Sequence, residues 1–79
     1  MEKWKVVGWR KVNFKDSRDV QVDGTSLFLA RPGEGSIVGL ETQKLFISSQ
    51  YVDYIPVENQ MIGINYNRYG KVQSIEVLN

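Results

Sequence analysis

The segment from Lys3 to Lys15 alternates in polarity with the period of two that is typical of a β-strand. Its even positions are mostly apolar, and its odd positions carry four lysines, which are Lys3, Lys5, Lys11 and Lys15. A helix would mix these two sets, and the valines of the segment favour extended chain. Gly8 interrupts the alternation, which predicts a bulge or a sharp bend, as a strand shared between two sides of a barrel needs.

Four further strands are predicted, separated by residues that favour turns. They are the segments 25–31, with residues 20–22 as an extension, 36–48, 61–67 and 71–78. Pro32 and Gly33 break the chain after the first of these, because proline cannot donate to a sheet ladder. Asp23-Gly24 and Arg68-Tyr69-Gly70 predict turns, and residues 48–56 are predicted to be irregular or to form one short helical turn.

Five short strands without a helical apolar stripe predict an all-β fold, specifically a small five-stranded antiparallel barrel. The OB-fold is favoured, with an SH3-like barrel as the alternative. About a dozen residues separate the predicted third and fourth strands, where an OB-fold carries a helix or a loop. Residues 1–79 make a single domain. No segment is apolar enough to cross a membrane, so we expect no membrane partner and a cytoplasmic location.

The chain contains no cysteine and no histidine. These absences exclude disulfides, thiolate metal sites and catalysis by imidazole. The nine carboxylates are spread along the chain without a close pair, and Ser48-Ser49 has no obvious base. The stretch 32–35 lacks the Gly-Lys-Ser/Thr ending of a phosphate-binding loop. We therefore expect no enzyme activity, no cofactor and no metal.

The net charge of +1 conceals an uneven distribution. Residues 1–18 hold six cations and two anions, residues 19–63 hold two cations and six anions, and residues 64–79 hold two cations and one anion. Short domains commonly scatter their charges in this way. If the two basic ends meet in the fold, however, they form one positive face that suits a polyanion.

Aromatic residues are interleaved with cations near both ends of the chain. Trp9 lies among lysines in the first predicted strand, and Tyr69 lies between cations in the last predicted turn. Single-stranded nucleic acid is bound by cations that hold phosphates and by exposed aromatic rings that stack on bases. We expect Trp9 and Tyr69 to stack on bases. The residues expected to contact phosphate are Lys5, Arg10, Lys11, Arg68 and Lys71. Trp4, Phe14, Phe28 and Phe46 are expected mainly in the core.

Three short motifs carry a resemblance to a known family. They are Val-Gly-Trp-Arg at 7–10 followed by Asn13-Phe14, Tyr-Ile-Pro at 54–56, and the run from Tyr66 to Val72 followed by Ser74-Ile75. In these features the chain resembles the small OB-fold single-stranded-DNA-binding, helix-destabilising proteins of filamentous phages. It is more similar still to their short relatives on Gram-positive phages, plasmids and conjugative elements.

The resemblance implies a symmetric homodimer that coats single strands cooperatively, without sequence preference, during replication of a mobile element. DNA is the favoured nucleic acid over RNA. The binding positions that the resemblance implies are Arg10, Arg18, Phe28 or Arg31, Arg68, Tyr69 and Lys71. The alternative is a small β-barrel module that dimerises or docks to a larger protein partner. The modest net charge fits this alternative, and the steep salt dependence of phosphate binding distinguishes the two.

Overall fold

The computed structural model describes residues 1–79 as one antiparallel sheet of five strands. β1 (Glu2–Lys15) pairs with β2 (Gln21–Pro32) and with β4 (Met61–Tyr66). β3 (Leu40–Ser48) flanks β2 and β5 (Val72–Val77) flanks β4, which gives the order β3-β2-β1-β4-β5. The predicted all-β class with five antiparallel strands is confirmed. The structure contains no helix that could span a membrane.

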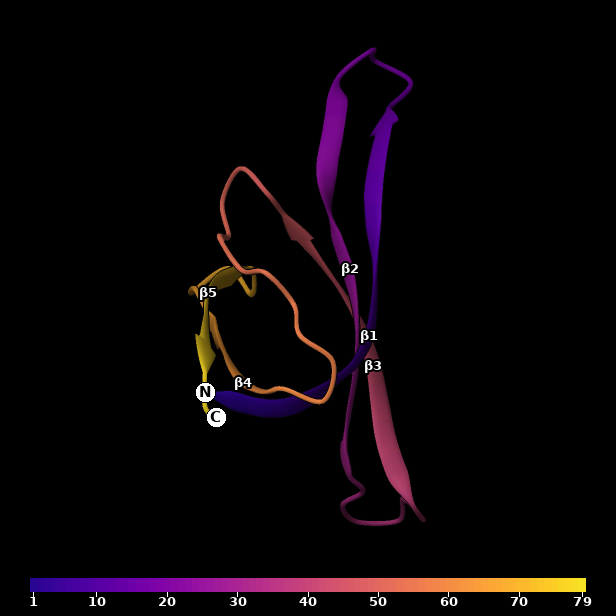
Figure 1. Ribbon diagram of the computed structural model, residues 1–79, viewed down its shortest axis with the longest axis vertical. Helices are drawn as coiled ribbons and strands as arrows, with labels where there is room; N and C mark the ends of the chain where they lie inside the picture. Colours follow the sequence, from indigo (N-terminus) through magenta and orange to yellow (C-terminus); the bar gives the residue numbers. More distant parts are fainter.

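β1 joins the two halves of the sheet because it bends near Gly8. Val6 pairs with Leu29 and Gly8 pairs with Phe28, so Val7 is the extra residue of a β-bulge. The bulge predicted from Gly8 is therefore present. Figure 1 shows β1 curving from β4 toward β2, with the β1–β2 hairpin extending beyond the rest of the molecule.

The core lies inside this bend. Its buried side chains come from all strands except β5 and from the segment between β3 and β4: Trp4, Val6, Leu27, Leu29, Ile47, Val52, Ile62 and Ile64. Glu2 forms hydrogen bonds with two aromatic residues. Its carboxylate accepts from the Trp4 indole (3.0 Å) and from the Tyr66 hydroxyl (3.3 Å). Burial, followed by the charge of Glu2, raises the pKa of Tyr66.

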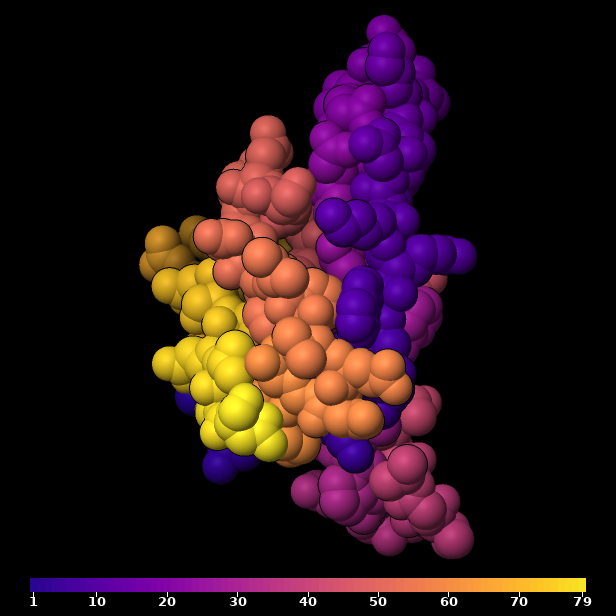
Figure 2. Space-filling model, in the orientation of Figure 1, coloured from indigo at the N-terminus to yellow at the C-terminus, as the bar shows by residue number.

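The predicted closure into a barrel is wrong, because β3 and β5 form the two edges of the sheet and do not pair with each other. The segment between β3 and β4 crosses the open side instead, as Figures 1 and 2 show. It contributes Val52 to the core and packs Tyr54 against it. The Tyr54 hydroxyl donates to Gln60 (2.5 Å) within the same segment. A packed loop therefore takes the place that strand pairing would have in a closed barrel.

β2 begins at Gln21, four residues before its predicted main segment, and runs straight through Asp23-Gly24, which was predicted to be a turn. The chain reverses earlier because the carboxylate of Asp16 accepts hydrogen bonds from the backbone N–H groups of Arg18 (2.8 Å) and Val20 (3.0 Å). The same two bonds lower the pKa of Asp16, and the bond from Val20 has the larger effect on it.

β3 begins at Leu40 rather than at Ser36. The Gly33 N–H donates to the Gly39 carbonyl (2.9 Å), and this bond closes a loop over the intervening residues. Gly39 has a φ of 87°, a conformation that glycine adopts at low cost. Gly39 thus directly precedes the start of the strand.

Candidate nucleic-acid interface

One face of β1, β2 and β3 points away from the core. In an antiparallel sheet, paired residues place their side chains on the same face. The pairs Arg10–Ser26, Ser26–Phe46, Phe28–Lys44 and Phe14–Val22 therefore share one face, to which the pair Lys5–Ala30 also belongs. We call this surface the basic–aromatic face and define it by Lys5, Arg10, Phe14, Phe28, Lys44 and Phe46.

All three phenylalanines of the chain lie on the basic–aromatic face. Their side chains are 50% (Phe14), 36% (Phe28) and 42% (Phe46) exposed. The prediction that they belong to the core is wrong, because the interior takes its residues from the opposite face of β2 and β3, including Leu27, Leu29 and Ile47. Three partly exposed rings on an otherwise uncovered sheet face are available for stacking.

Two of these rings rest on glycine. The ring of Phe28 lies over Gly8, where an added Cβ would be 3.7 Å from it, and the ring of Phe46 lies over Gly24. Packing on bare backbone holds each ring in place while leaving part of its surface open. From the strand spacing and the rise per residue, the Cα atoms of Phe28 and Phe46 are about 8 Å apart. That separation lets each ring hold a base of its own.

The cations of the basic–aromatic face are exposed and unpaired. Lys5, Arg10 and Lys44 take no part in the three ion pairs of the structure. No aspartate or glutamate shares this face on the three strands, since Glu2, Asp23 and Glu41 alternate with its members and point the other way. The acidic middle of the sequence therefore does not neutralise the face.

The β-bulge in β1 puts residues that were predicted to share one face of the strand on opposite faces. Trp9 pairs with Leu27 and Lys11 pairs with Thr25, so both point to the face opposite Lys5. Trp9 is 40% exposed there. The predicted grouping of Lys5, Trp9 and Lys11 on one face is therefore wrong, because the extra residue of the bulge shifts the alternation by one position.

Arg31 is held in a structural contact. Its Nε donates to Glu41 Oε2 at 2.7 Å, and its guanidinium lies 4.0 Å from the centre of the Trp4 ring. The hydrogen bond to Glu41 raises the pKa of Arg31. The nucleic-acid contact that the resemblance implies for Phe28 or Arg31 conflicts with this arrangement at Arg31, because an anion would have to compete with Glu41.

The remaining predicted residues lie at two turns. Arg18, at the tip of the β1–β2 hairpin, is largely exposed and contacts Asp16 at 3.2 Å. In the β4–β5 turn, Arg68 lies 5.2 Å from the ring of Tyr69, which is 73% exposed as predicted. Lys71 is exposed at the end of the same turn. Figure 1 shows this turn on the other side of the molecule from the β1–β2 hairpin, so the cations of the turn lie apart from those of the hairpin tip, although the start of β1 pairs with β4.

The structure therefore brings together Lys5, Arg10 and Phe28 of the predicted site and adds Phe14, Lys44 and Phe46. Lys44 could have been found from the sequence, because it alternates with Phe46 in a strand whose odd positions hold Leu45 and Ile47. No group of three or more acidic side chains is arranged to hold a metal ion. Comparison of the chain with protein-family models, curated proteins and solved structures gave no match.

Proposed function

We propose that this protein binds single-stranded nucleic acid through the basic–aromatic face. The observation that carries the proposal is the presence of three exposed phenylalanines and three unpaired cations on one face without a carboxylate. The rings stack on bases of any kind, because every base has a π face, and the cations hold the phosphates. Binding along this face is independent of sequence for the same reason.

The resemblance of the chain to phage and plasmid helix-destabilising proteins supports DNA as the nucleic acid. It also supports a role in coating the single strand during replication of a mobile element in the host cytoplasm. The β4–β5 turn, with Arg68 against Tyr69, fits a second contact to the same strand or to its neighbour. No covalent chemistry is part of this function.

The test is a titration of labelled oligo-dT by fluorescence anisotropy, with the wild type and with Phe46→Ala. A stacking ring contributes about 1–3 kcal/mol per base, so the variant should bind roughly 5- to 150-fold more weakly. Tyr51→Ala removes an aromatic side chain that is 79% exposed outside this face, and it should bind like the wild type. Circular dichroism checks that both variants are folded. Failure of the wild type to bind at low salt would refute the proposal.

Self-association is a second candidate function, favoured by apolar residues that the fold leaves in solvent. Val38 is 97% exposed in the loop before β3, and Ile55 is 82% exposed in the segment before β4. A homodimer, or docking to a larger protein, would cover such residues. Light scattering over a range of protein concentration tests this function. An apolar interface should respond little to salt, whereas phosphate binding weakens steeply.

A further inference from the structure

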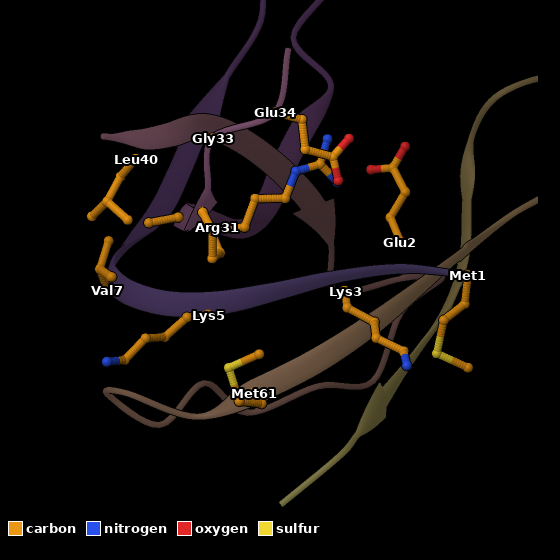
Figure 3. A pocket seen from close by; sticks show the side chains of 12 residues that line it. Met1, Glu2, Lys3, Lys5, Val7, Arg31, Gly33, Glu34, Leu40 and Met61 are labelled. Carbon is orange, nitrogen blue, oxygen red and sulfur yellow. The ribbon is translucent and has the colours of Figure 1, made fainter. Parts of the chain in front are cut away.

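A groove opens where β1 and β2 diverge. The two strands pair only as far as Lys5 and Ala30. Beyond that point β1 continues along β4 to Glu2, while β2 continues along β3 to Pro32. The split leaves a groove of about 840 Å³, shown in Figure 3, which lies in the size range of small-ligand sites.

One side of the groove is basic, and the other carries both a cation and a carboxylate. Lys3 and Lys5 line one side, and neither forms an ion pair. Arg31 and Glu34 line the other side, and Figure 3 shows the Glu34 carboxylate directed toward the Arg31 guanidinium, with Glu2 nearby. The apolar lining of the groove includes Val7, Leu40 and Met61.

Arg31 forms its hydrogen-bonded ion pair with Glu41 and not with Glu34. Its strongest partner is Glu41, and the charges of Glu2 and Glu34 add to the rise in its pKa. Glu2 already accepts from Trp4 and Tyr66. Glu34, which is exposed in the loop after β2, therefore keeps the capacity to accept a hydrogen bond from a ligand.

The groove is continuous with the basic–aromatic face. Val7 lines the groove and also a smaller depression of about 240 Å³ that Phe28 and Lys44 border. A strand that stacks on Phe28 would therefore pass directly into the groove. Its next nucleotide would find an apolar lining for the base and ammonium groups for the phosphate.

We propose that the groove binds one unstacked nucleotide of that strand and selects a base with an exocyclic amino group. This inference rests on the proposed function and deepens it. The phosphate lies at Lys3 and Lys5, the base lies against Val7 and Leu40, and Glu34 accepts from the amino group. Cytosine offers such a donor to a carboxylate. Thymine presents its O4 carbonyl at the position of that amino group, and a carboxylate repels this oxygen.

The experiment compares equal-length oligo-dC and oligo-dT at neutral pH and fixed salt, by fluorescence anisotropy. Both are pyrimidine strands, so their stacking on the phenylalanines is similar. The wild type should bind oligo-dC about threefold to tenfold more tightly, the value of one additional hydrogen bond. Glu34→Gln should remove this preference, because an amide donates as well as accepts. Glu58→Gln, at an exposed carboxylate outside the groove, should retain it.

Each outcome bears on a separate claim. Absence of binding to either strand at low salt would refute the proposed function. Equal affinity of the wild type for both strands would leave that function standing and overturn the groove proposal. A preference that persists in Glu34→Gln would also overturn it. So would light scattering that reveals a dimer disrupted by Leu40→Asp, because the groove would then be an interface between copies.

Discussion

Two cationic side chains have different surroundings in this protein. Lys44 is exposed on the basic–aromatic face, whereas Arg31 is bound to Glu41 and lies over Trp4. Each phosphate contact to a single strand contributes about 0.7 to the slope of log K against log salt concentration. Lys44→Ala should therefore lower that slope by about 0.7, and Arg31→Ala should leave it unchanged. Anisotropy titrations at several salt concentrations measure both slopes.

Thermal unfolding provides the control for this comparison. Arg31→Ala should lower Tm, because it leaves Glu41 unpaired and uncovers Trp4, while Lys44→Ala should leave Tm nearly unchanged. If Arg31→Ala reduced the salt slope as much as Lys44→Ala, Arg31 would be a phosphate contact and its ion pair with Glu41 would open on binding.

At the scale of the strands, the period of two in residues 3–15 was sufficient to predict β1 and the bulge at Gly8. It could not predict which face each half of β1 presents, because that depends on the one residue by which the bulge shifts the pairing. The sequence likewise could not predict which face of the sheet the phenylalanines lie on. Phe28 and Phe46 look like core residues in sequence, yet the alternate positions of β2 and β3 face the interior. Which side of a strand is covered is decided by segments distant in sequence.

The pairing of β1, β2 and β3 predicts that one glycine tolerates substitution by alanine and that another does not. A Cβ at Gly24 would lie 2.5 Å from the Phe46 ring and collide with the carbonyl oxygen of Ile47. Gly24→Ala should therefore destabilise the fold by about 1–3 kcal/mol. A Cβ at Gly8 would meet only the Phe28 ring, at 3.7 Å, so Gly8→Ala should change stability by less than about 0.5 kcal/mol. Urea unfolding measures both, and equal losses would contradict the packing of the two rings.

At the scale of the whole molecule, the sheet stays open between β3 and β5, and the segment between β3 and β4 covers the gap. The sequence predicted that this segment is irregular. It did not predict that Val52 completes the core, because neither periodicity nor pairing marks an isolated apolar residue in a loop. The stability of the open sheet should therefore depend on a loop residue as strongly as on a residue of a strand.

Two neighbouring residues of this segment test that conclusion. Val52 is buried and Tyr51 is 79% exposed, so the smaller side chain of Val52 should contribute more to the free energy of unfolding. Val52→Ala should lower the free energy of unfolding by about 1–3 kcal/mol, through lost burial and the cavity left behind. Tyr51→Ala should change it by less than about 0.5 kcal/mol, although it removes more atoms. Urea unfolding of both variants measures the difference. The reverse order would mean that the segment does not seal the sheet in solution.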